Sequence, residues 1–182
     1  MDNSSQNSEK VFLYKQWDAK IFKYELEQGS ITLMPRPPGG THLEPYIAFL
    51  KDRNVDIVIS LLQFNEVNAL SLTNEGYACE EAGIEFINFQ IKDHSVPQFI
   101  TPFNLLVEKL LNEVNAGKNI AIHCYAGIGR TGLLAASILI KGGMMVDSAL
   151  LELSKKRGVR VPETIQQISW LHHHIDELLT RH

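Results

Sequence analysis

The chain is organised around residues 119–132, NIAIHCYAGIGRTG. Ile120 to Ile122 form an apolar run that predicts a short buried strand. A glycine-rich loop follows at once, and residues 133–140 (LLAASILI) predict an apolar helix. A strand, a glycine-rich loop and a helix N-terminus together favour an anion site, because backbone N–H groups converge next to the positive end of the helix.

Cys124 begins this loop and Arg130 ends it, with five residues between them. A free thiol has a pKa of about 8.5, but N–H groups, a helix N-terminus and a guanidinium favour the thiolate, with values of roughly 3.5–7.5 known in such settings. The same loop suits a phosphoryl group, which Arg130 is able to hold through two of its oxygens. The pattern therefore predicts covalent phosphoryl transfer to Cys124.

These residues resemble the His-Cys-x5-Arg-Ser/Thr signature of Cys-dependent protein tyrosine phosphatases. The form Ala-Gly-x-Gly-Arg-Thr-Gly at residues 126–132 is similar to the compact dual-specificity branch, including its bacterial members. The resemblance covers roughly residues 31–175 and implies a phosphocysteine intermediate. It implies that residues 125–130 bind the phosphate, which adds Tyr125, Ala126, Gly127, Ile128 and Gly129 to Arg130.

Three other interpretations of the loop fit the sequence less well. Gly127-x-Gly129-x-x-Gly132 matches a dinucleotide fingerprint, and Asp147 lies twenty residues beyond Gly127, but too little chain follows for further βαβ units. A Walker A loop needs Gly-Lys-Ser/Thr, and Arg130 stands where the Lys is needed. A structural turn with an inert Cys124 does not explain the paired Arg130.

Thiolate attack on a phosphate ester needs a general acid to protonate the leaving oxygen. Residues 92–97 (KDHSVP) follow the strand expected at 84–91, and Asp93 lies there. By resemblance this is the mobile loop with the acidic Asp, although it lacks the Trp-Pro-Asp form of the large tyrosine-specific enzymes. The alternatives are an Asx turn at Asp93, and His94 as the acid.

The resemblance also gives roles to two neighbours of the catalytic pair. The hydroxyl of Thr131 would hydrogen-bond the Cys124 sulfur and ease its departure, and a helix N-terminal cap is a compatible reading of the same side chain. His123 would orient the loop through backbone hydrogen bonds. In a second step, water would hydrolyse the thiophosphate with Asp93 as base.

Several further side chains carry open alternatives. Arg36 is either a solvated loop charge or a border of the phosphate pocket, and Gln167 either begins the last helix or positions water. Cys79 either packs as a small apolar residue or resolves an oxidised Cys124. The run His172 to His174 points in three directions on a helix, so the sequence predicts no metal site there.

Composition points to an ordinary globular protein. The 182 residues fit one domain, and we expect residues 1–10 to be a disordered lead-in and residues 11–182 to be a single phosphatase domain. A net charge of −4 and the absence of an apolar run near eighteen residues give no sign of a nucleic-acid or membrane partner. Two cysteines are too few for a disulfide framework, and a thiolate nucleophile implies a reducing compartment, so we expect a cytoplasmic protein. We also expect a monomer without cofactor or metal.

The periodicities predict an α/β fold, with a central, mostly parallel sheet, helices on both faces, and the phosphate-binding loop between a strand and a helix. We expect a hairpin from residues 11–14 and 21–26, and further strands at 31–34, 56–62, 84–91 and 120–122. Helices are expected from Thr41 to Arg53, at 66–70, 74–82, 102–114, 130–141 and 147–157, and from Thr164 to Arg181.

The pattern also bears on the substrate. The chain is too short for the pocket-deepening segments of the large enzymes, so a shallower pocket would accept phosphoserine and phosphothreonine beside phosphotyrosine. Tyr125 and Ile128 are uncharged, whereas phosphoinositide phosphatases of similar signature carry Lys there. We therefore favour a phosphorylated protein over a phosphoinositide or an RNA 5′ end. A phosphate-binding adaptor without turnover is the alternative of another class.

Overall fold

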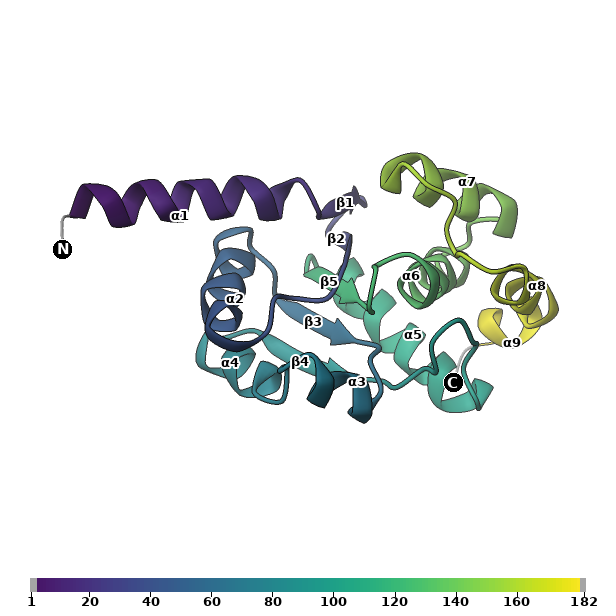
Figure 1. The fold of residues 1–182 in the computed structure, drawn as a ribbon. Helices are drawn as coiled ribbons and strands as arrows, with labels where there is room; N and C mark the ends of the chain where they lie inside the picture. The colour runs from purple at the N-terminus through teal and green to yellow at the C-terminus, as the bar shows by residue number, and fades with distance from the viewer. Residues whose placement is uncertain (1–2, 181–182) are drawn as a thin grey trace.

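The computed structural model describes residues 3–180, and these form an α/β structure, as predicted (Figure 1). Their five-stranded sheet has the order β1-β2-β5-β3-β4. Strand β1 (Phe22–Glu25) pairs antiparallel with β2 (Ser30–Met34), and β2 is parallel to β5 (Asn119–His123). β5 is parallel to β3 (Ile57–Ser60), which is parallel to β4 (Glu85–Asn88). The mostly parallel sheet is therefore confirmed.

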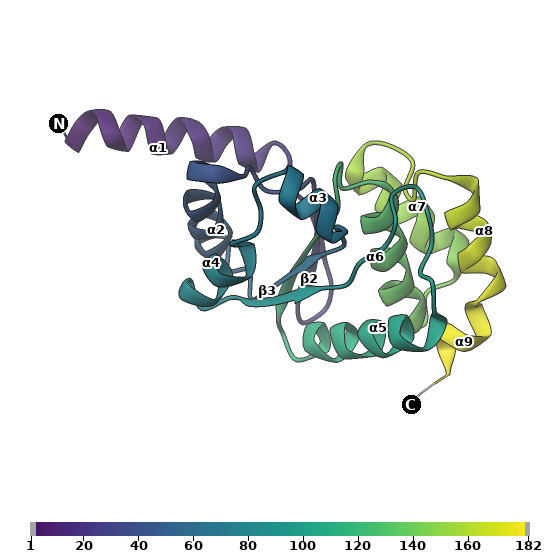
Figure 2. The same ribbon diagram turned by 60° about the horizontal axis from the view of Figure 1, so that its bottom comes forward.

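Helices cover both faces of the sheet (Figures 1 and 2). The end of α1 packs with α2 and α4 on one face, and α5 to α9 pack on the other. The bounds are α1 Asn3–Asp18, the 3-10 helix η1 Gly40–His42, α2 Leu43–Asp52, α3 Phe64–Ala69, α4 Glu75–Glu81, α5 Ile100–Asn115, α6 Gly129–Lys141, α7 Val146–Arg157, α8 Ile165–His173 and α9 Ile175–Leu179.

The central strand explains the apolar run before the signature loop. Ile120 and Ile122 belong to the core cluster under α5 and α6, whereas Ala121 between them belongs to the cluster under α2 and α4. Successive side chains of a strand point to opposite faces, so a strand covered on both faces must be apolar throughout. Helix α6 is likewise buried along its whole length, which accounts for its apolar sequence.

The parallel strands end level with one another. Met34 of β2 and Ser60 of β3 both stand opposite His123 of β5, and Ser60 stands opposite Asn88 of β4. The loops that leave these four strands therefore begin at one edge of the sheet. Ligand sites of open α/β sheets lie at this carboxyl edge.

The N-terminal prediction was wrong in two respects. Residues 3–10, expected to be disordered, and residues 11–14, expected to be a strand, all belong to helix α1; Met1 and Asp2 lie outside the described residues. Tyr14 and Trp17 give the reason, because their rings pack on Tyr46 and Phe49 of α2. The hairpin exists, but β1 pairs with β2 instead of with residues 11–14.

Two other predicted elements differ in detail. Residues Gly40–His42 form a 3-10 turn before α2, and no side-chain hydrogen bond caps that helix. The last predicted helix is two helices, α8 and α9, with a break at His174. Ile165 is 74% exposed because it occupies the first turn of α8, whereas Leu171 and Leu178 are buried. The remaining strands and helices lie where the periodicity placed them, with shifted ends.

Candidate active site

The loop between β5 and α6 fits closely over the end of the sheet. Cys124 is buried, and Gly127 has a φ of +69°, a conformation that favours glycine. A Cβ atom at Gly127 would lie 2.3 Å from the carbonyl carbon of Met34, so a side chain there has no room. The backbone N–H of Arg36 donates to the Tyr125 carbonyl at 3.1 Å, which ties the loop after β2 to the signature loop.

Arg130 is the most densely paired side chain at this edge. It is 1% exposed and its two terminal nitrogens donate to the two carboxylate oxygens of Glu66, at 2.7 and 2.9 Å. Nη1 also donates to the Ile91 carbonyl at 3.0 Å, and Nη2 forms an ion pair with Oδ1 of Asp93 at 2.9 Å. The loops after β3, β4 and β5 thus meet at one guanidinium.

The charges in this cluster stabilise one another. Burial alone would lower the pKa of Arg130, but the hydrogen bonds to Glu66 and the negative charges of Cys124, Glu66 and Asp93 raise it overall. Burial alone would raise the pKa of Glu66, yet hydrogen bonds from Arg130 and from the Gln63 backbone, with the charge of Arg130, lower it. Both groups are therefore charged at neutral pH.

One edge of the Arg130 guanidinium has spare hydrogen-bonding capacity. Its Nε atom is buried and donates to no acceptor among the described residues. Nη2 carries two protons, one for Glu66 and one that faces Asp93. A phosphate that displaced Asp93 would find Nε and Nη2 side by side, while Glu66 kept its own two bonds. The arrangement fits bidentate capture of an oxyanion.

The loop after β4 is the exposed wall of this edge. Asp93 is 52% exposed at its side chain, and His94, with a φ of +56°, lies 3.4 Å from it through Nε2. The other ring nitrogen of His94 is 3.7 Å from Glu163 Oε2, which links the loop to the segment before α8. Asp93 reaches Arg130, whereas His94 faces outward.

A second buried acid lies on the far side of the signature strand. His123 Nε2 is 2.8 Å from Oε1 of Glu75 at the start of α4, and both side chains are almost completely buried. The contact is not aligned as a hydrogen bond, and Glu75 Oε2 also lacks a donor among the described residues. His123 Nδ1 lies 3.3 Å from the Cys124 carbonyl oxygen. Glu75 thus contacts His123, the residue before Cys124.

The two cysteines lie in different surroundings. Cys79 packs in the core cluster under α2 and α4, and Cys124 belongs to the cluster under α5 and α6. Burial, and then the charge of Glu75, raise the pKa of the Cys79 thiol to about 12. A thiol that stays protonated is a poor partner in disulfide exchange, so Cys79 fits the packing alternative.

The three remaining candidate residues, Thr131, Gln167 and Arg36, differ in the contacts that they make. The hydroxyl of Thr131 is buried and finds no hydrogen-bond partner among the described residues, so its contact with the Cys124 sulfur stays a prediction. Gln167 forms a capping box with Thr164 and donates to the Ser95 carbonyl at 3.0 Å, so it begins α8 and also holds the Asp93 loop. Arg36 stacks on the ring of Tyr125 at 5.3 Å, and is therefore at the border of the signature loop.

Three features bear on metals, membranes and the His run. The side chains of His172, His173 and His174 contact Asp147, the Ser169 carbonyl and the Trp170 ring, respectively. Residues 3–180 contain no cluster of His, Cys, Asp and Glu suited to a metal ion. Within the same range, no helix has both the length and the apolar character needed to cross a bilayer.

Sequence reasoning missed Glu66 and Glu75. Glu66 was noted only as the start of a short helix, although an acid just after a buried strand at the catalytic edge was a usable signal. Its carboxylate also accepts the Gln63 N–H at 2.9 Å, which explains its place in the first turn of α3. Glu75 follows the polar residues Thr73 and Asn74 and has the sequence context of a solvated helix start, so no local signal distinguished it.

Comparison with known proteins identifies the family. Residues 33–144 match the family model described as "Polymorphic toxin system, DSP-PTPase phosphatase". The chain belongs to this family. The match includes Cys124, Arg130 and Asp93, and it confirms the predicted place of the chain among Cys-dependent, dual-specificity-type phosphatases.

Individual relatives agree with the family. "Protein tyrosine phosphatase domain-containing protein 1" of Danio rerio is 39% identical over 87 residues, which are 47% of this chain but only 11% of the relative. Kinase-associated phosphatase has a similar structure, with a TM-score of 0.80 at 21% identity, covering 89% of this chain and 97% of its own. PTPMT1 in complex with PI(5)P has a TM-score of 0.69 at 20% identity, covering 86% and 96%. The two structures show the shared fold.

Proposed function

We propose that the protein is a Cys-dependent phosphatase that hydrolyses phosphotyrosine, and phosphoserine and phosphothreonine as well, on protein substrates. The observation that carries the proposal is the position of Arg130. Arg130 lies in the first turn of the helix that follows the Cys124 loop. Glu66 fixes its guanidinium, Nη2 faces Asp93, and Nε has no acceptor among the described residues. A nucleophile, an oxyanion holder and a proton donor thus belong to one cluster.

In the first step, the Cys124 thiolate attacks phosphorus and the bond between phosphorus and the substrate oxygen breaks. The incoming phosphate takes the Nε–Nη2 edge and displaces Asp93. Asp93, displaced from Arg130 and protonated by solvent, gives that proton to the leaving oxygen. Glu66 holds Arg130 in place meanwhile, so the guanidinium does not have to reorganise.

In the second step, water attacks phosphorus and the sulfur–phosphorus bond breaks. Asp93, now ionised, accepts the water proton, and inorganic phosphate and the Cys124 thiolate remain. The Thr131 hydroxyl, which makes no other hydrogen bond, supports the returning negative charge on sulfur. His123 supports the loop through its contact with the Cys124 carbonyl.

Replacement of the nucleophile provides the main test. Cys124→Ser should lower the hydrolysis of p-nitrophenyl phosphate by roughly 10⁴- to 10⁶-fold, since a triad-type nucleophile knockout has effects of that order. Release of p-nitrophenol is measured in the presence of a chelator from pH 5 to 8. Cys79→Ala is the matched control and should keep wild-type activity. Activity that survives Cys124→Ser, or that needs a divalent ion, would sink the mechanism.

The general acid is tested by a pair of adjacent variants. Asp93→Asn should lower kcat by about 10²- to 10³-fold with phosphoserine peptides, whose leaving group needs a proton, and far less with p-nitrophenyl phosphate, whose leaving group does not. His94→Gln should leave both rates within about 2-fold, because the exposed His94 ring contacts Asp93 and Glu163, whereas Asp93 is the residue of this loop that pairs with Arg130. If His94→Gln, instead of Asp93→Asn, slows the phosphoserine peptides far more than p-nitrophenyl phosphate, His94 is the acid.

A further inference from the structure

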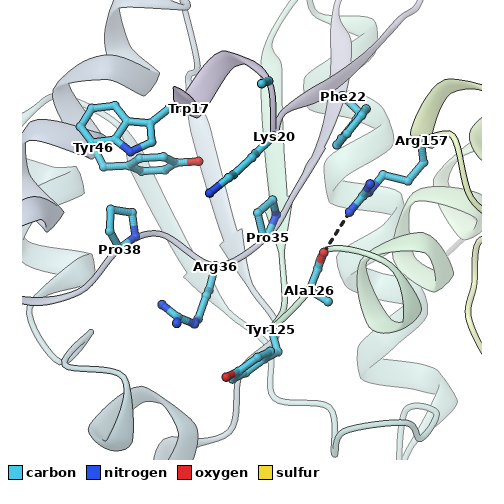
Figure 3. Close-up of a pocket in the computed structure, with 11 residues that line it drawn as sticks. Trp17, Lys20, Phe22, Pro35, Arg36, Pro38, Tyr46, Tyr125, Ala126 and Arg157 are labelled. Carbon is cyan, nitrogen blue, oxygen red and sulfur yellow. Dashed lines mark hydrogen bonds between the residues drawn. The ribbon is translucent and has the colours of Figure 1, made fainter. Parts of the chain in front are cut away.

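A cavity of about 560 Å³ adjoins the outer side of the signature loop (Figure 3). Tyr125 and Ala126, the two residues after Cys124, form one wall. Trp17 at the end of α1 and Lys20 just after it form another, and the loop after β2 with Arg36 closes the space between them. The cavity therefore begins one residue from the nucleophile.

Three cations enter this cavity from separate segments. They are Lys20 after α1, Arg36 after β2 and Arg157 at the end of α7, and the described residues that line the cavity include no acid. None of the three forms an ion pair with any of the side chains that the structure describes. A patch of three positive charges without counter-charge stands out in a chain whose net charge is −4. Such a patch attracts an anion.

The three cations are held in place by different means. Arg157 donates to the carbonyls of Ala126 and Gly127 at 3.2 Å and lies over the Phe22 ring at 4.2 Å. Arg36 donates to the Pro37 carbonyl at 3.2 Å and stacks on Tyr125. Burial lowers the pKa of Arg157, and the Cys124 charge partly opposes that shift. Lys20 makes no side-chain contact of these kinds and is exposed, so its ammonium is available to a ligand.

We infer that this cavity binds an acidic side chain of the substrate, phosphorylated or carboxylate, that flanks the residue being dephosphorylated. The inference rests on the proposed phosphatase function and adds a substrate preference to it. It also supplies, from outside the signature loop, the positive charge that the uncharged Tyr125 and Ile128 do not provide.

The lining favours a polypeptide over a polyhydroxylated headgroup. Beside the cations, the walls are aromatic rings and prolines, including Trp17, Tyr46 and Pro35, with few neutral hydrogen-bonding groups. An inositol ring needs partners for its hydroxyls, whereas an acidic side chain on an apolar or aromatic stem needs only a cation and an apolar wall. Since an extended peptide advances about 3.3 Å per residue, the acidic side chain lies roughly one to three residues from the scissile one.

The test compares phosphotyrosine peptides that carry Gln, Glu or a second phosphotyrosine at one flanking position at a time. At one position, kcat/KM should rise at least about 10-fold from Gln to the acidic residue, as expected for a charge-assisted hydrogen bond. Lys20→Gln should reduce that ratio to about 2-fold or less and leave p-nitrophenyl phosphate turnover unchanged, because Lys20 lines the cavity but lies outside the signature loop. Lys23→Gln, which removes a lysine paired with Glu25 outside the cavity, should keep the full ratio.

Binding without turnover keeps the inference separate from the proposed function. The same peptides are titrated into Cys124→Ser protein and followed by fluorescence polarisation, with Trp17 emission as a second signal in a Trp170→Phe background. Equal affinity for Gln and acidic peptides, or a preference that survives Lys20→Gln, would overturn the cavity's role even if hydrolysis is normal. So would Lys20-dependent turnover of a soluble short-chain phosphoinositide faster than that of the acidic peptides, which would make the occupant a lipid headgroup.

Discussion

Arg130 and His123 are both buried, both lie within seven residues of one another around Cys124, and both contact a glutamate from the cluster of loops and helices at the sheet edge. Their pairings are otherwise different. Arg130 has a bidentate partner in Glu66, a carbonyl acceptor and the exposed Asp93. His123 has one close but misaligned contact with Glu75, in a place that solvent does not reach.

The difference separates a group that must exchange partners from a group that must not. Arg130 is able to give up Asp93 to a phosphate and still keep Glu66, because solvent reaches Asp93 and the guanidinium has five donors. Glu75 and His123 have no such alternative, since a buried polar group that loses its partner is left without a hydrogen bond and destabilises the fold. We therefore expect the Arg130 side to control chemistry and the His123 side to control stability.

Among changes to these two pairs, the largest effect is expected for Arg130→Lys. A lysine keeps the positive charge but loses the fork that holds Glu66 and an oxyanion at the same time, so kcat/KM for p-nitrophenyl phosphate should fall by about 10³-fold. Arg53→Lys is the matched control, because Arg53 forms a similar fork with Asp18 on the surface, and its activity should stay within about 2-fold. A loss of less than about 10-fold for Arg130→Lys would show that charge alone suffices.

The next effect is on stability and falls on the other pair. Glu75→Gln should lower the free energy of unfolding by about 1–3 kcal/mol, the cost of a buried polar group without its proper partner. Urea denaturation measures it, and Glu80→Gln, on the exposed side of the same helix, should be within about 0.5 kcal/mol of wild type. Should Glu75→Gln instead be stable and inactive, the two pairs would have the same role.

Much of this arrangement was readable in the sequence, and the unreadable part has a common cause. Residue type and spacing predict Cys124, Arg130 and Asp93, because the proposed chemistry depends on two short loops that are each continuous in the sequence. The helix α1 was missed since residues 1–10 are polar and its packing depends on Trp17 meeting α2, a tertiary contact. Glu66, Glu75 and the Lys20–Arg36–Arg157 cavity likewise depend on residues far apart in the chain, which periodicity and motif do not place.

The smallest effect is expected for Glu66→Gln, and it sharpens the contrast with Glu75. The amide keeps one acceptor for Arg130 but removes the charge, so kcat/KM should fall about 10-fold, with a change in unfolding free energy below about 1 kcal/mol. The difference in unfolding free energy between the wild type and Glu66→Gln should depend on pH. Arg130 holds the pKa of Glu66 below its ordinary value of 4.5, so the carboxylate's contribution is complete above about pH 5 and is lost as the pH falls through the lowered value. Urea titrations of both proteins at pH 7 and at pH 3.5 should therefore show a stability gap that narrows at the lower pH; a gap that widens there would mean that Glu66 folds in its protonated form.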